Sequence, residues 1–114
     1  MWPNMLQVKS RDKKQAPVFA ALGCDARLEL LSRLSDGRDC SITELTDGLE
    51  LTRQAVTKHL GVLQQAGVVS RRRVGRESRF TLQPGPITQA KDYLKQVSDQ
   101  WDQSIARLRA MVEP

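Results

Sequence analysis

The order of apolar and polar residues predicts a mainly helical chain with one hairpin in its second half. Apolar side chains recur every three or four residues over 17–22, 25–35, 42–49, 52–66 and 87–112, which is the period of helices that bury one face. Over 68–82 apolar residues instead alternate with polar ones, as they do in half-buried strands. The expected order is therefore four helices, two strands and a long terminal helix.

Start and stop signals support the first two helices. Pro17 suits a first turn, where its missing N–H removes no hydrogen bond, and Gly23 ends that helix. The second helix ends at the turn signal Asp36-Gly37. Its expected core-facing residues are Ala26, Leu28, Leu30, Leu31 and Leu34.

The third helix should start at Ser41, because Ser41 and Glu44 have the spacing of a capping box. We expect a short helix whose buried residues are Ile42, Leu45 and Leu49. A connection of about three or four residues, around 49–51, then leads to the fourth helix. Two helices joined by so short a turn form a helix-turn-helix.

The fourth helix, 52–66, has a packed side and a polar side. Thr52 is a suitable N-cap, and Gly67 can close the other end in the left-handed region. The apolar stripe consists of Val56, Leu60 and Leu63, and the first turns also present Arg53, Gln54, Thr57 and Lys58. A polar, basic front on the second helix of a helix-turn-helix suits a DNA major groove, although an ordinary solvated face has a similar composition.

Two strands are expected at 68–73 and 78–82, around a turn that Gly75 supplies. Phe80 and Leu82 alternate with polar neighbours, so one face of the hairpin can pack on the helices. Arginines on the strands and at the tip, directly after the fourth helix, indicate a wing over 70–80 that can reach a narrow minor groove.

Pro84-Gly85-Pro86 is expected to break the chain before the last helix, 87–112. At 1.5 Å per residue this helix is roughly 39 Å long, more than the rest of the domain can cover. Its apolar seam should therefore pair with a second copy; the alternative is that the helix folds over its own domain. The expected dimer interface consists of Phe19, Leu22, Leu94, Val97, Trp101, Ile105 and Leu108.

Composition indicates a single globular domain. The chain has 114 residues, of which 39% are hydrophobic and 27% charged. No apolar run approaches the roughly 20 residues of a membrane helix, and residues 1–14 lack a signal-peptide pattern. Because two cysteines make no disulfide framework, we expect a cytoplasmic protein. The expected division is an N-terminal arm (1–15), a winged helix-turn-helix domain (16–83) and a dimerisation helix (84–114).

The positive charge is concentrated in one part of the sequence. Residues 53–79 carry seven basic side chains and one acidic one, whereas the remainder carries eleven basic and twelve acidic ones. The net charge of +5 therefore arises within 53–79. A local basic surface is typical of a protein with a polyanionic partner, although a solvated charged loop is the alternative.

This order of elements resembles the ArsR-type winged-helix repressors. The matching strings are FAALGCDARLELLSRL, SITELTDGLELTRQAVTKHLGVLQQAGVVSRRRVGRESRFTL and WDQSIARLRAM, within residues 16–112. The resemblance implies a homodimer that binds a palindromic operator in double-stranded DNA and represses transcription, often of its own gene. The terminal helix with a central Trp is similar to a subgroup that does not sense metals.

The metal sites of that family are not complete in this sequence. Ser41 and Thr43 occupy the positions of the Cys-x-Cys pair of arsenic and cadmium sensors, and neither supplies a thiolate. The terminal helix, where zinc sensors have His and acidic ligands, contains aspartates but no histidine. We therefore expect no metal and no cofactor.

Cys24 and Cys40 leave a thiol-based alternative open. A helix of about ten residues separates them, roughly 15 Å end to end, which is too long for a disulfide within one subunit. We interpret both cysteines as structural. A repressor that responds to oxidants through these thiols, or to a small ligand in a dimer pocket, is the alternative.

The candidate DNA-binding residues fall into three groups. The polar front of the fourth helix should meet base edges in the groove. Residues that should cap helices or position phosphates are Ser41, Thr52 and His59. The wing should contribute Arg72, Arg73, Arg76 and Arg79.

A protein- or RNA-interaction module is the alternative from another class. A-form RNA hides its major groove, and Phe80 is the lone aromatic residue of the basic region that could stack on bases, so duplex DNA fits better. An enzyme is not expected, because the single histidine lies on the presumed DNA face and no Gly-rich phosphate loop is present.

Overall fold

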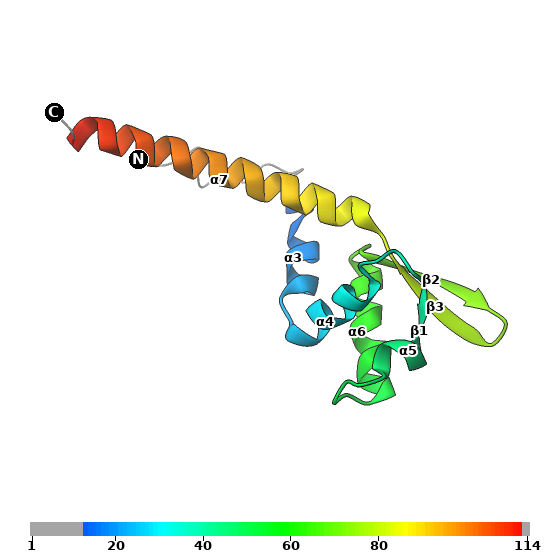
Figure 1. The fold of residues 1–114 in the computed structure, drawn as a ribbon. Helices are drawn as coiled ribbons and strands as arrows, with labels where there is room; N and C mark the ends of the chain where they lie inside the picture. The colour runs from blue at the N-terminus through cyan, green and yellow to red at the C-terminus, as the bar shows by residue number, and fades with distance from the viewer. Residues whose placement is uncertain (1–12, 113–114) are drawn as a thin grey trace.

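The computed structural model describes residues 13–112 (Figure 1). Its elements in chain order are α3 (Ala16–Leu22), α4 (Asp25–Leu34), β1 (Cys40–Ser41), α5 (Ile42–Thr46), α6 (Arg53–Gln65), β2 (Val69–Val74), β3 (Glu77–Leu82) and α7 (Pro84–Val112). The predicted mainly helical fold with a small β-hairpin is confirmed. The predicted arm, 1–15, lies mostly outside the described residues.

One apolar core joins α4, α6 and the sheet. Val56, Leu60 and Leu63 of α6 are fully buried, as their spacing predicted. They belong to the same cluster as Leu30 of α4 and Phe80 of β3. The apolar side of α6 is therefore fixed against the body, and its polar side is left to solvent.

The prediction that Leu28 faces this core is wrong, because its side chain is 50% exposed. The buried leucines of α4 are Leu30, Leu31 and Leu34. At about 100° per residue their centre lies roughly 110° around the helix from Leu28, so one face cannot bury all four. Ile42 and Leu49, also predicted to be buried, are partly buried at the edge of the core.

The helix-turn-helix of α5 and α6 is confirmed, with a longer connection than expected. The Glu44 N–H donates to Ser41 Oγ at 3.1 Å, and the Ser41 N–H donates to Glu44 Oε1 at 3.4 Å, which completes the capping box. The connection covers 47–52 rather than 49–51, because α5 has a single turn and ends early.

Both ends of α6 form as predicted. Thr52 Oγ1 accepts a hydrogen bond from the Ala55 N–H at 3.1 Å. At the other end Gly67 has a φ of +81°, in the left-handed region where a Cβ is costly. The Val68 N–H then donates to the Leu63 carbonyl at 3.1 Å, so this turn leads directly into β2.

Both strands of the hairpin form within one residue of their predicted bounds, with β2 at 69–74 rather than 68–73 and β3 at 77–82 rather than 78–82. Val74 pairs with Glu77, which leaves Gly75 and Arg76 as the two turn residues. Gly75 has a φ of +61°, as the first residue of a type II′ turn requires. This tight turn fixes which side chains of β2 and β3 share a face.

A third strand, β1, was not predicted. It pairs with β3, so the strand order is β1-β3-β2. Cys40 lies opposite Phe80, and Ser41 lies opposite Arg79. A strand this short gives no alternation that could be read from the sequence, yet it ties the start of α5 to the base of the wing.

The prediction that Pro84-Gly85-Pro86 breaks the chain is wrong. These residues form the first turn of α7, where N–H groups have no partner within the helix and proline is tolerated. The helix is roughly 43 Å long and projects from the body beyond α3 (Figure 1). Near its start Tyr93 packs on Phe19 of α3, with ring centroids 5.9 Å apart.

Candidate nucleic-acid interface

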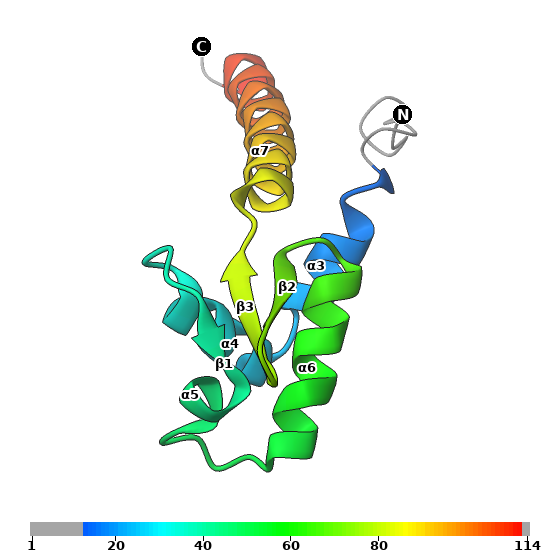
Figure 2. The same cartoon turned by 90° about the vertical axis from the view of Figure 1, so that its right-hand side faces the viewer.

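The polar front of α6 lies at the end of the body opposite to α7. Both views show α5 and the N-terminal end of α6 at that end, while the β2–β3 hairpin extends from the side of the body (Figures 1 and 2). The predicted groove residues are all exposed on α6: Arg53, Gln54, Thr57 and Lys58. The structure therefore places the start of α6 at the end of the body opposite to α7, with α5 and the hairpin beside it.

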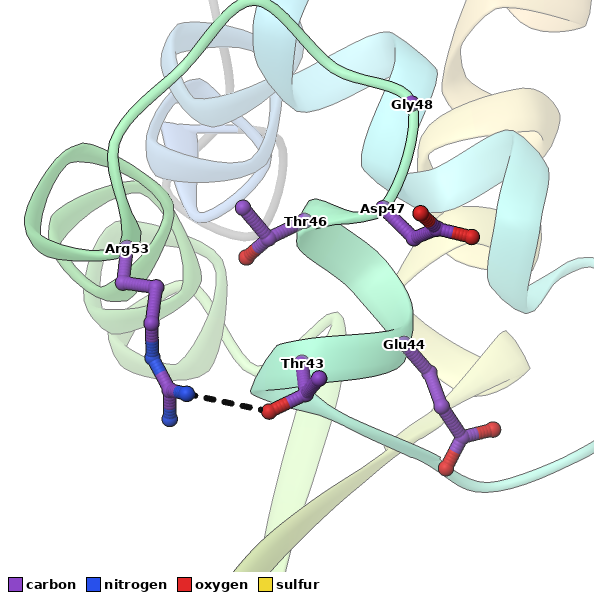
Figure 3. A pocket seen from close by; sticks show the side chains of 6 residues that line it. All are labelled: Thr43, Glu44, Thr46, Asp47, Gly48 and Arg53. Atoms are coloured by element: carbon purple, nitrogen blue, oxygen red, sulfur yellow. Dashed lines mark hydrogen bonds between the residues drawn. The ribbon is translucent and has the colours of Figure 1, made fainter.

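A hollow of about 480 Å³ lies between α5 and the start of α6, lined by residues that include Thr43, Glu44 and Arg53. Figure 3 shows Arg53 and Thr43 pointing toward each other at this hollow, and Arg53 Nη1 donates to Thr43 Oγ1 at 3.1 Å. Thr57 Oγ1 donates to the Arg53 carbonyl at 2.7 Å. Thr43 thus orients the Arg53 guanidinium by accepting from one of its N–H groups. The other N–H groups of this guanidinium face no acceptor among residues 13–112.

The strand register separates the wing arginines into two groups. Arg72 lies opposite Arg79 and shares its face, whereas Arg71 and Arg73 lie on the other face. Arg71, Arg73 and the turn residue Arg76 are exposed, and no carboxylate within residues 13–112 pairs with them. Arg71 was not among the predicted wing residues, because its face depends on a register that the sequence did not reveal.

Arg79 is held at the base of the wing by three carboxylates. Its guanidinium contacts Asp39 Oδ2 at 3.2 Å, Glu44 Oε1 at 3.1 Å and Glu77 Oε2 at 3.0 Å, and its side chain is 22% exposed. Arg72 also contacts Asp39 Oδ2, at 3.0 Å, but its side chain is 72% exposed. Arg79 therefore braces the hairpin against α5, while Arg72 keeps most of its surface accessible.

Acid should weaken this brace. The Arg79 guanidinium lowers the pKa of Asp39, and the Ser41 backbone N–H lowers the pKa of Glu44. A carboxyl whose pKa is lower in the folded state adds stability above its unfolded pKa, about 4 for both types, and this stability is lost as pH falls through the folded value. We expect the melting temperature to fall more steeply below about pH 5 in the wild type than in Asp39→Asn.

Circular dichroism melts at several pH values would measure this difference. Asp92→Asn removes an exposed aspartate of α7 that pairs with no arginine of residues 13–112, so this control should keep the wild-type dependence. Equal pH dependences in the wild type and Asp39→Asn would contradict the assignment.

The predicted capping and phosphate-positioning residues differ in accessibility. Ser41 is buried and its hydroxyl caps α5, whereas Thr52 is exposed and caps α6. His59 is partly exposed on the flank of α6, and its Nδ1 lies 3.2 Å from Arg27 Nη1. Arg27 had no signal in the sequence, because its contacts are to residues of two other helices.

The two cysteines occupy different environments, and both thiols are free. Cys24 is the partly exposed N-cap residue of α4, where the Arg27 backbone N–H lowers the pKa of its thiol. Cys40 is buried, and burial raises the pKa of its thiol. Across residues 13–112 no group of three His, Cys, Asp or Glu side chains could hold a metal ion.

The seam of α7 is an exposed apolar surface. Four of the predicted interface residues expose about half of their side chains: Leu94 (54%), Trp101 (53%), Ile105 (44%) and Leu108 (52%). Val97 is partly exposed, and Phe19 and Leu22 pack partly on the core of their own domain. No helix within residues 13–112 has both the length and the apolar character needed to cross a membrane.

Comparison with known proteins identifies the family. Residues 22–72 match a family described as a helix-turn-helix domain. The chain is 40% identical over 65 residues to the HTH-type transcriptional regulator YuzN of Bacillus subtilis. This match covers 52% of this chain and 71% of YuzN. The transcriptional activator HlyU of Vibrio cholerae is 29% identical over 79 residues, 69% of this chain and 72% of HlyU.

Comparison of the fold with solved structures leads to the same family. An ArsR-like transcriptional regulator from Rhodococcus sp. RHA1 is similar in structure, with a TM-score of 0.77 and 34% sequence identity, over 89% of this chain and 94% of that protein. These relatives are transcriptional regulators rather than enzymes. With its helix-turn-helix, its wing and its long terminal helix, the chain belongs to the ArsR-type family of winged helix-turn-helix transcriptional regulators.

Proposed function

We propose that this regulator is a homodimeric repressor of the cytoplasm that binds a palindromic operator. In this proposal α6 enters the major groove and the β2–β3 wing lies at the adjacent minor groove. The observation that carries it is the exposed apolar seam of α7, at the opposite end of the body from the polar front of α6. Pairing of two seams would join two bodies and leave both α6 helices available for half-sites one helical turn apart.

Repression is the direction that we propose, because a dimer bound across a promoter can block transcription without any further contact. The relative HlyU is named an activator, so membership of the family does not decide the direction.

A binding and transcription assay tests the proposal. We expect the protein to shift DNA from upstream of its own gene, to protect a two-fold symmetric site and to lower transcription from that promoter in vitro. Preferential binding of RNA, or equal affinity for all duplexes, would favour the alternative of an RNA- or protein-interaction module.

Arg76→Ala should weaken DNA binding evenly across sequences. Arg76 is exposed at the hairpin turn and pairs with no carboxylate of the described residues, so it is available to a phosphate. Loss of one phosphate contact should lower the salt slope of the binding constant by about one unit per wing, or about two per dimer. Titrations at several salt concentrations with operator and random duplexes would measure both effects.

The matched control is Lys95→Ala, which removes a cation from the polar face of α7. The Lys95 side chain is 77% exposed and pairs with Asp99 at 3.8 Å. This variant should keep the wild-type slope. An unchanged slope in Arg76→Ala would place Arg76 away from the DNA.

A further inference from the structure

One side chain outside the basic surface links three helices. Arg27 lies in the first turn of α4, and its Nε donates to the Ala21 carbonyl at 2.6 Å. Its Nη2 donates to the Ala20 carbonyl at 3.4 Å, also near the end of α3. Its Nη1 lies 3.2 Å from Nδ1 of His59 on α6. The guanidinium therefore connects the end of α3 to the flank of the helix that carries the groove residues.

This contact decides which nitrogen of His59 carries the proton. A guanidinium has donors and no acceptor, so Nδ1 must accept, and the proton of the neutral imidazole is on Nε2. The ring is partly exposed, and Nε2 has no partner within residues 13–112. The result is a neutral N–H donor whose ring is oriented by Arg27.

The place of His59 on α6 fits a phosphate better than a base. At about 100° per residue, His59 lies roughly 70° from the centre of the buried face formed by Val56, Leu60 and Leu63, so it lies on the flank of the helix. A helix in a major groove about 12 Å wide has a phosphate backbone along each flank. His59 faces the flank on which α4 lies, whereas Gln54 and Lys58 lie on the polar front.

We propose that Arg27 is a positioning residue for DNA binding, which holds His59 so that Nε2–H donates to a backbone phosphate beside the groove. The inference rests on the proposed docking of α6 in the major groove. Arg27 acts through His59, and its bonds to the α3 carbonyls keep the guanidinium in place. Because every nucleotide carries a phosphate, this contact is independent of base sequence. Because the donor is neutral, the contact releases no counterion.

The test uses the full chain and a random-sequence duplex. His59→Asn places an amide oxygen near the position of Nδ1, so it can keep the bond to Arg27 while the Nε2 donor is lost. We expect this variant to keep its melting temperature and salt slope and to lose affinity roughly fivefold for each bound subunit, as for one hydrogen bond. Wild-type affinity in His59→Asn would overturn the proposal.

Two variants of Arg27 separate positioning from charge. Arg27→Lys keeps the charge but cannot form the fork, so we expect it to lose as much affinity as Arg27→Gln, roughly fivefold for each bound subunit. Combining Arg27→Gln with His59→Asn should cost no more affinity than the stronger single change. Full affinity in Arg27→Lys, or additive losses in the double variant, would overturn the proposal.

Nuclear magnetic resonance gives a readout that does not depend on affinity. His59 is the single histidine of the chain, so its ring nitrogen signals are unambiguous. We expect the Nε2–H tautomer in the wild type, slowed exchange of that proton on addition of the duplex, and loss of this protection in Arg27→Gln. A ring protonated on Nδ1 would overturn the assignment. A wild-type protein that binds no duplex would instead count against the proposed function, while the tautomer would still test the Arg27–His59 contact.

Discussion

Replacing Trp101 with glutamate is expected to convert the protein to a monomer and to lower its affinity for a palindromic operator about 100-fold or more. Trp101 is 53% exposed in the single chain, so its replacement removes little from the core of that chain. In the proposed dimer the same position lies within a buried apolar seam, where an unpaired carboxylate is strongly unfavourable. The loss follows because a monomer contacts one half-site and no longer gains from simultaneous binding of two.

Gln103→Glu is the matched control for this substitution. Gln103 is exposed on the same helix, and at about 100° per residue it lies roughly 150° or more around α7 from the centre of the seam. It adds the same charge without entering the proposed interface, so the control should remain dimeric. Sedimentation would report the assembly state, and anisotropy on whole and half operators would report the affinity.

The two readouts can separate dimerisation from DNA binding. The monomeric variant should bind a half operator as well as the wild type does, because Trp101 belongs to α7, which projects from the end of the body opposite to the polar front of α6. A Trp101→Glu protein that remains a dimer would show that another surface pairs the subunits. A monomeric wild type that binds the whole operator with full affinity would refute the role of α7.

Features determined by neighbours in sequence could be predicted. The capping box of Ser41 and Glu44, the cap at Thr52 and the turn at Gly75 each depend on groups within three residues, so local spacing suffices. The buried stripe of α6 followed equally from its own period. This local information was enough to predict the helix-turn-helix and the wing.

The errors arose where a local rule has two structural outcomes. Proline stops a helix in the interior but is accepted in the first turn, so Pro84 and Pro86 could end one element or begin another. Leu28 is apolar and spaced correctly from Leu31, but the core lies toward Leu30 and Leu34. Only the position of the neighbouring helices distinguishes these outcomes.

The contacts that organise the candidate interface are distant in sequence. Arg27 and His59 are 32 positions apart, and Arg79 and Glu44 are 35 apart. Single arginines such as these carry no signal of their partner, so the sequence assigned Arg79 to the wing surface and did not indicate Arg27. In the fold some arginines, such as Arg79, hold the candidate interface in place, and others, such as Arg76, are exposed and available to a phosphate.

Arg53→Ala is expected to relax the sequence preference of the protein more than it lowers its general affinity for DNA. Arg53 is the exposed first residue of α6, and Thr43 orients its guanidinium through a 3.1 Å hydrogen bond. A bidentate arginine contact to a base contributes about 1–3 kcal/mol of discrimination, which is roughly 5- to 150-fold per half-site. Binding to the operator should fall by this factor at each half-site, and binding to random DNA should fall only by the loss of one charge per subunit.

Two further variants separate the parts of this effect. Arg53→Lys keeps the charge and loses the planar fork, so it should keep the salt slope while preference for the operator declines. Thr43→Val removes the acceptor that orients the guanidinium, so it should weaken preference less than Arg53→Ala does. If Arg53→Ala lowered affinity equally for operator and random duplexes, Arg53 would contact the backbone, and base reading would then rest on Gln54, Thr57 and Lys58, the remaining exposed residues of the polar front.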